Sequence, residues 1–129
     1  MAKIEKFEDL EIWQLAREIC NDVWHIIENT PLQKDFKLKE QINASSGSTM
    51  DNISEGFERG GNREFYQFLS IAKASCGETR SQLYRCYDRK YINEEAFKSI
   101  SDKTILNSKK ISSFMTYIKN SDRKGSKYD

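Results

Sequence analysis

The sequence predicts an all-α fold, an up-and-down antiparallel four-helix bundle. Apolar residues recur at three- and four-residue steps in four segments of roughly 20 residues, which places them on one face of each helix. Only 37% of the 129 residues are hydrophobic and 32% are charged, so the core has to be built from narrow stripes. The short loops between segments predict that consecutive helices pack antiparallel within one domain.

The first two helices are expected over residues 9–28 and 36–57. Asp9 can cap the first helix, and Pro31 ends it because proline lacks the amide hydrogen that continues a helix. Asp35 is the expected N-cap of the second helix. The first helix has a dense apolar stripe, whereas the second has only Leu38, Ile42, Met50 and Ile53.

Turn residues separate the last two helices from their neighbours. Gly60 and Gly61 can take the left-handed conformations that end a helix, and Asn62 is expected to cap the third helix. The third helix ends near residue 90, and Asn93 starts a fourth that runs to about residue 119, with Glu94 in its first turn. The predicted organisation is an N-terminal arm (1–8), a four-helix bundle (9–119) and a polar, flexible tail (120–129).

The stretch SSGSTMDNISEG, residues 45–56, interrupts the apolar pattern of the second helix. Small and polar residues share the face of Ile42 and Ile53, namely Gln41, Ser45, Ser48, Thr49, Asn52 and Gly56. Small side chains let two helix backbones approach closely, and a hydrogen-bonded network there would fix the register between the second and third helices. The alternative is that Asn52, Glu55 and Glu78 form an acid–base site, if burial raises the pKa of a carboxyl group.

Three segments resemble one protein family: FEDLEIWQLA at 7–16, SGSTMDNISEGFERG at 46–60 and EFYQFLSIAKASCGETRSQL at 64–83. They are similar to the four-helix-bundle proteins encoded in intervening sequences of bacterial 23S ribosomal RNA genes. The accessory variability determinant of diversity-generating retroelements resembles the same family. The resemblance covers about residues 7–118, although Ser54 and Thr79 stand where relatives usually carry Ala and Leu. Its signature residues, expected to form a polar core, are Ser48, Asn52, Glu55, Gly56, Ser75, Glu78 and Gln82.

The resemblance implies a bundle that assembles as a homopentamer and is not an enzyme. For the retroelement branch it also implies a basic oligomer that binds nucleic acid and a reverse transcriptase. No cofactor is expected.

The residues themselves also argue against catalysis. His25 is the single histidine, and a di-metal bundle needs histidines on two helices, so no metal site is expected. Ser70 and Lys73 match a Ser-x-x-Lys pair but lack the motifs that accompany it in penicillin-recognising enzymes. The three cysteines lie inside helical patterns and are expected to be reduced. Without a signal-peptide pattern or an apolar run long enough for a bilayer, we expect a cytoplasmic protein.

Charge is unevenly distributed along the chain. Residues 1–28 hold three basic and seven acidic side chains, and residues 97–129 hold eight and three. An up-and-down bundle brings a first basic group to one end: Lys34, Lys37, Lys39, Arg85, Arg89 and Lys90. A second group follows the last helix and tail: Lys109, Lys110, Lys119, Arg123, Lys124 and Lys127. Repeated around a ring, either group would multiply phosphate contacts; the alternative is a solvated surface, because Asp88, Glu94 and Glu95 dilute the first group.

The sequence therefore predicts a non-enzymatic oligomer that binds RNA or DNA through basic surfaces with little sequence specificity. The alternative is a protein-binding scaffold, for example for a reverse transcriptase, without direct nucleic-acid binding. The acidic first helix and the basic last helix suggest that adjacent subunits join head to tail, the contact from which closed rings are built.

Overall fold

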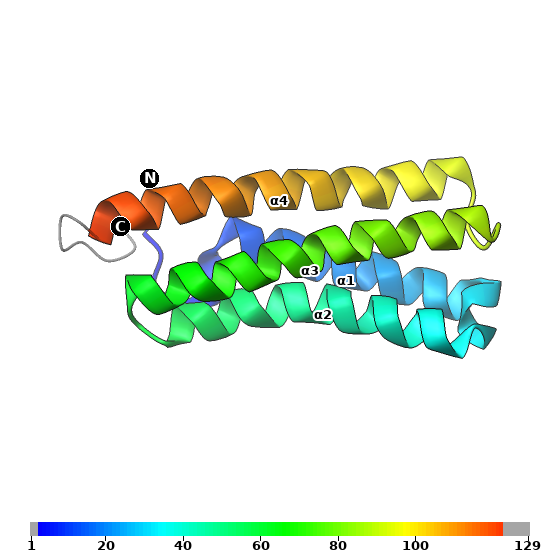
Figure 1. Ribbon diagram of the computed structural model, residues 1–129, viewed down its shortest axis with the longest axis horizontal. Helices are drawn as coiled ribbons and strands as arrows, with labels where there is room; N and C mark the ends of the chain where they lie inside the picture. Colours follow the sequence, from blue (N-terminus) through cyan, green and yellow to red (C-terminus); the bar gives the residue numbers. More distant parts are fainter. Residues whose placement is uncertain (1–2, 123–129) are drawn as a thin grey trace.

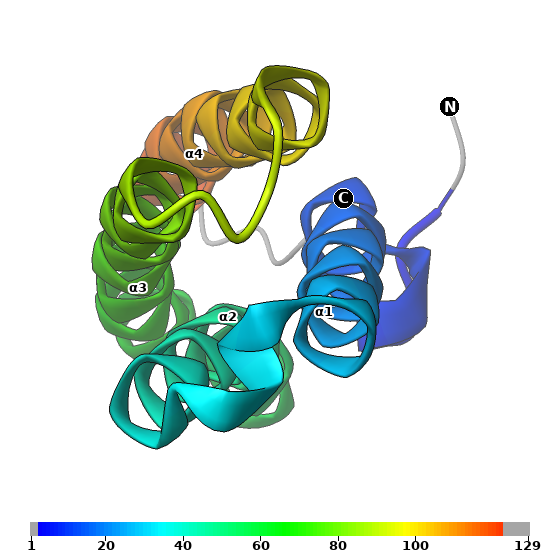
Figure 2. The same ribbon diagram turned by 90° about the vertical axis from the view of Figure 1, so that its right-hand side faces the viewer.

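The computed structural model describes residues 3–122 and confirms the all-α four-helix bundle. Its helices are α1 (Glu11–Asn29), α2 (Phe36–Glu58), α3 (Asn62–Asp88) and α4 (Glu94–Asp122), with short 3-10 helices η1 (Phe7–Asp9) and η2 (Pro31–Lys34). Consecutive helices run in opposite directions (Figure 1), and the end view shows them arranged around a common centre (Figure 2). Within the described residues, no helix combines the length and the hydropathy that crossing a bilayer requires.

Two of the predicted helix caps are confirmed. The Asp35 carboxylate accepts a hydrogen bond from the Leu38 N–H group at 3.4 Å, and this starts α2. The Asn93 side-chain oxygen accepts one from the Ala96 N–H group at 2.8 Å before α4. In both cases the side chain satisfies an amide that the helix itself leaves without a partner.

The caps predicted at Asp9 and Asn62 are wrong, because each side chain has another partner. The Asp9 carboxylate accepts hydrogen bonds from the N–H groups of residues 5 and 6, so it holds the start of η1 instead of α1. The Asn62 amide donates to the Ile118 carbonyl at 3.4 Å and ties the start of α3 to α4. Of the two glycines expected to end α2, Gly60 takes a left-handed conformation (φ 82°), whereas Gly61 is extended.

Helix α3 ends in a left-handed turn at Lys90, whose φ of 63° is unusual for a residue with a side chain. The Lys90 N–H group donates to the Tyr87 carbonyl, and the Tyr91 N–H group donates to the Cys86 carbonyl. This is the Schellman arrangement, in which glycine normally occupies the left-handed position. Helix α4 continues to Asp122, three residues beyond the predicted end, and residues 123–129 of the expected tail lie outside the described part of the chain.

The apolar core consists of two clusters, one toward each end of the bundle. One contains Ile19, Val23, Ile26, Ile27, Leu32, Leu38, Ile42, Leu83, Cys86, Ile92 and Ile100. The other contains Leu10, Ile12, Ala16, Ile53, Phe65, Leu69, Ala72, Ile111 and Ile118. Between them along the helices lie buried polar side chains, which we call the polar layer: Ser45, Ser46, Thr49, Ser75, Thr79, Thr104 and Asn107.

The polar face of α2 packs on α3, as the small residues at 45–56 predict. The Ser45 hydroxyl lies 2.8 Å from the Thr79 hydroxyl and donates to the Gln82 side-chain oxygen at 2.6 Å. One turn further along α2, the hydroxyls of Ser48 and Ser75 lie 3.0 Å apart. These bonds connect defined positions of two helices, so they fix the register of α2 against α3 while satisfying buried polar groups.

The first and last helices are joined by ion pairs. The Lys103 ammonium group lies 2.9 Å from a Glu18 carboxylate oxygen and 2.7 Å from one of Asp22. Lys110 forms an ion pair with Glu11. Acidic side chains of α1 and lysines of α4 are therefore paired inside one chain.

The close approach of α2 and α3 gives a first prediction. A Cβ atom added at Gly56 would lie 2.6 Å from Phe68 Cβ and 2.9 Å from the Phe65 ring, whereas one added at Gly47 meets nothing within 4 Å. We expect Gly56→Ala to destabilise the protein by about 1–3 kcal/mol because the helices must separate. The control Gly47→Ala should stabilise it by about 0.5–1 kcal/mol through helix propensity. Urea unfolding measures both, and equal effects at the two sites would contradict the packing described here.

Asn107 gives a second prediction. It lies on α4 between the two lysines that pair with α1, it is fully buried, and neither polar atom of its amide has a hydrogen-bond partner within residues 3–122. An unsatisfied buried polar group costs about 1–3 kcal/mol, so Asn107→Leu should raise the free energy of unfolding by an amount of that order. The control Thr104→Val removes a hydroxyl that donates to the Ser101 carbonyl and should give no such gain. A less stable Asn107→Leu protein would show that the amide is satisfied in solution.

Candidate nucleic-acid interface

The topology brings the first basic group to one end of the bundle, as the sequence predicts. This end contains η2, the start of α2 and the end of α3, at the right of Figure 1. We call it the basic end, and its cations are Lys34, Lys37, Lys39, Arg85, Arg89 and Lys90.

Asp35 contacts one arginine and one tyrosine at the basic end. Its carboxylate accepts a hydrogen bond from the Tyr91 hydroxyl at 2.8 Å and lies 2.5 Å from the Arg89 guanidinium. The Tyr91 hydroxyl, together with Arg89 and the Leu38 N–H group, lowers the pKa of Asp35. Asp35 therefore stays ionised and holds Arg89 in place, because its negative charge is matched by a donor on each side.

Three lysines of the basic end are exposed and unpaired within the described residues, whereas both arginines have side-chain partners. Lys34, Lys37 and Lys90 are exposed, and none of them forms an ion pair within the described residues. Arg85, by contrast, donates to the Gln41 side-chain oxygen at 3.0 Å. Acidic side chains at 88, 94 and 95 are exposed at the same end, so the positive potential there is moderate.

Lys90 combines exposure with a strained backbone. A left-handed conformation costs a residue with a Cβ atom about 1–2 kcal/mol relative to the right-handed one. Strained residues of this kind concentrate at functional sites, and here the strain places a cation at the outermost turn of the basic end.

Of the second basic group, the structure describes Lys109, Lys110 and Lys119. Lys110 is engaged by Glu11 of the same chain, which leaves Lys109 exposed beside it. Lys119 lies far along α4 in a separate pocket. The predicted cations Arg123, Lys124 and Lys127 lie outside the described residues.

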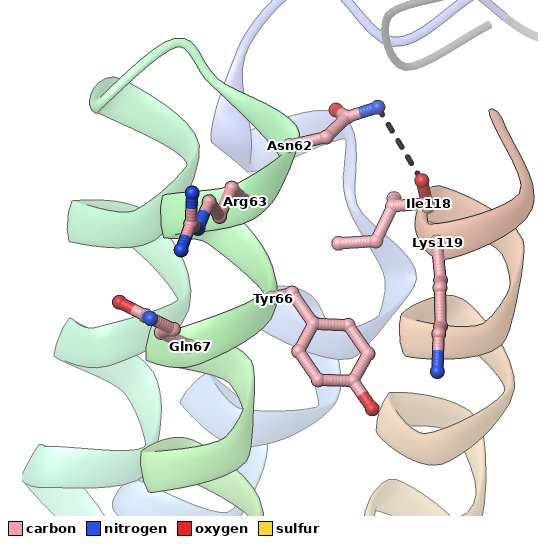
Figure 3. A pocket seen from close by; sticks show the side chains of 6 residues that line it. All are labelled: Asn62, Arg63, Tyr66, Gln67, Ile118 and Lys119. Atoms are coloured by element: carbon pink, nitrogen blue, oxygen red, sulfur yellow. Dashed lines mark hydrogen bonds between the residues drawn. The ribbon is translucent and has the colours of Figure 1, made fainter. Parts of the chain in front are cut away.

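A shallow cavity of about 200 Å³ lies between the start of α3 and the end of α4. Figure 3 shows the Tyr66 ring and the Lys119 side chain side by side in the space between the helices, whereas Arg63 and Gln67 lie along α3. Arg63 cannot be predicted as part of this cavity from the sequence, because nothing in the pattern links it to a lysine 56 positions away.

The signature residues split between the α2/α3 contact and the surface. Ser48, Asn52, Gly56, Ser75 and Gln82 lie in the contact, where the Asn52 amide donates to the Ser48 carbonyl at 2.7 Å.

The expectation that Glu55 and Glu78 belong to the polar core is wrong, since both are exposed. Glu55 pairs with Arg59 one turn along α2, and Glu78 accepts a hydrogen bond from Gln82 on α3. Both carboxylates keep access to water and have a neighbour on their own helix. The geometry therefore does not support the acid–base alternative.

The other polar candidates lie apart from one another. His25 is exposed and contacts Asn29 on the same helix. Ser70 and Lys73 are both exposed on α3. No cluster of three or more potential metal-ligating side chains occurs within residues 3–122.

The Asp35 contacts give a prediction about pH. A group whose pKa is lowered by folding contributes stability above its unfolded pKa, about 3.9, and that contribution is lost as the pH falls through the lower folded value. We therefore expect Asp35→Asn to have a lower free energy of unfolding than the parent protein near pH 6, and we expect this difference to disappear toward about pH 2. Thermal unfolding across this range measures the difference, with Asp88→Asn as the control for loss of one negative charge at the same end. A difference independent of pH would contradict the role of the ionised carboxylate.

Comparison with known proteins gives the family of the chain. The family model described as "23S rRNA-intervening sequence protein" matches residues 8–113. Among solved structures, the chain is similar to a protein of unknown function from the S23 ribosomal protein family of Bacteroides thetaiotaomicron, with 23% identity and a TM-score of 0.73 over 81% of this chain and 97% of that one. At this identity the likeness concerns the fold. None of the curated proteins compared matches the sequence. The chain belongs to the 23S rRNA-intervening sequence protein family.

Proposed function

We propose that this chain is a non-enzymatic, cytoplasmic, oligomeric protein that binds RNA or DNA through its basic end. The observation that carries the proposal is the exposure of Lys34, Lys37 and Lys90 at one end, where Asp35 is already paired with Arg89. Free ammonium groups release counterions from a polyanion, which is the main source of non-specific nucleic-acid affinity. Phosphate contacts carry no base information, so recognition depends on charge and shape.

Assembly into a ring, for which we propose a homopentamer, multiplies these contacts. Each subunit would add its own basic end, and linked weak sites bind a long polymer more tightly than one site does. Lys110 and Glu11 already form an ion pair within one subunit, so we expect the subunit interface to rest mainly on other residues. Within such an assembly a reverse transcriptase is a candidate protein partner.

The direct test neutralises the exposed lysines. We expect the double variant Lys34→Gln/Lys37→Gln to bind RNA and DNA of any sequence more weakly, and to lower the slope of log Kd against log salt by about 1–2. The control Arg63→Gln/Lys73→Gln removes the same charge elsewhere and should leave the slope unchanged. Oligomeric mass is measured alongside by light scattering. An intact oligomer that binds neither polymer at about 50 mM salt would favour a protein-binding scaffold instead.

Substitution of Lys90 gives a test in which stability is expected to rise while nucleic-acid affinity falls. Lys90→Gly removes both the strain and the charge, so it should raise the free energy of unfolding by about 1 kcal/mol and weaken nucleic-acid binding. Lys90→Gln keeps the strain and should weaken binding without the gain in stability. Unchanged binding by both variants would exclude Lys90 from the interface.

A further inference from the structure

We propose that the outer surface of α1 and α2 beside the basic end binds unpaired nucleotides, whose bases stack on Phe36 and Trp24. The proposal rests on the proposed function and names its substrate class, single-stranded segments of RNA or DNA. In this arrangement the nearby lysines contact the phosphates, and the two aromatic rings contact the bases.

Phe36 is the most exposed of the large hydrophobic side chains of the described chain. It is the first residue of α2 and is 69% exposed, whereas Leu38 and Ile42 on the same helix are fully buried. Two exposed lysines, Lys34 and Lys37, are close to it in sequence, and the Lys39 ammonium group lies 5.1 Å from the centre of its ring. Base stacking on an aromatic ring within a positively charged groove is the usual way in which proteins hold single strands.

Trp24 extends this surface onto α1. Its side chain is 50% exposed. The Cys20 thiol donates to the Ser46 carbonyl at 3.1 Å, and this contact fixes the level of α1 against α2. Because the two helices are antiparallel, Trp24 lies one turn from that contact, level with Ile42. Phe36 is six residues further along α2, about 9 Å by the helical rise, so one strand can reach both rings.

The charges on this surface fit a polyanion. The Arg17 guanidinium lies 5.8 Å from the centre of the Trp13 ring on the same side of α1 as Trp24, and Lys39 lies over Phe36. Exposed Glu28 and Glu40 on the same helices reduce the positive potential. We therefore expect weak, salt-dependent binding, with Kd values on the order of 1–100 μM at physiological salt.

A preference for unpaired strands distinguishes this surface from the lysines alone. Phosphates are present in duplexes and in single strands, so the lysines serve both. In a duplex the base faces are covered by their neighbours, and only an unpaired base can place its face against a protein ring. Removing the rings should therefore affect single strands selectively.

The experiment measures fluorescence anisotropy of labelled single-stranded oligonucleotides and matched hairpin duplexes of about 16 nucleotides, in RNA and DNA versions, with the full chain. The variants are Phe36→Ala, Trp24→Ala and Phe36→Leu, which keeps an apolar side chain without a ring. Leu106→Ala is the control, because Leu106 is similarly exposed (46%) on α4. Thermal unfolding is expected to change little, since Phe36 is 69% and Trp24 50% exposed. Phe36→Tyr keeps a stacking ring and should bind as the parent protein does.

We expect each of the three ring-removing substitutions to raise the Kd for single strands by about fivefold or more and to change the Kd for duplexes by less than about twofold. An equal loss of affinity for single strands and duplexes, or no loss for either, would overturn the stacking surface while the proposed function stands. If the parent protein binds none of the oligonucleotides, whether single-stranded or duplex, the proposed function itself is overturned. A loss for single-stranded RNA alone, or for single-stranded DNA alone, would identify which strand the surface takes.

Discussion

The rest of the structure depends on the close contact between α2 and α3. Gly56 leaves room for Phe68, and Ser45 is hydrogen-bonded to Thr79 and Gln82 on the facing helix. Larger apolar residues would have filled the same volume, but they can slide along one another by a turn. Directed hydrogen bonds between short side chains permit one alignment only, so the level of every loop at both ends of the bundle follows from this contact.

That alignment places the start of α2 beside the end of α3 and thereby creates the basic end. Asp35 both caps α2 and binds Arg89 and Tyr91, which follow α3 in the chain. One carboxylate therefore connects the two loops and offsets one of the cations around it. The lysines that remain are available to solvent because no acidic side chain of the described chain pairs with them. A contact that stabilises the fold thus lies next to the lysines that attract anions.

Much of the fold could be predicted from the sequence, because helix periodicity and loop length are local properties. Asp35 and Asn93 can be predicted as caps because their side chains reach amides three residues away. Asp9 and Asn62 have the same chemistry, yet each is bound by a partner that spacing does not reveal.

The site was harder to predict for the same reason. The carboxylates Glu55 and Glu78 share the spacing of the polar face, but their positions at its edge leave them in water. The intrachain pairing of Lys110 likewise depends on which helices become neighbours.

The polar layer between the two apolar clusters also has a kinetic consequence. Each end of the bundle has its own apolar cluster, so one end can open transiently and exchange its amide hydrogens while the other stays closed. The basic end can then loosen without unfolding of the whole domain.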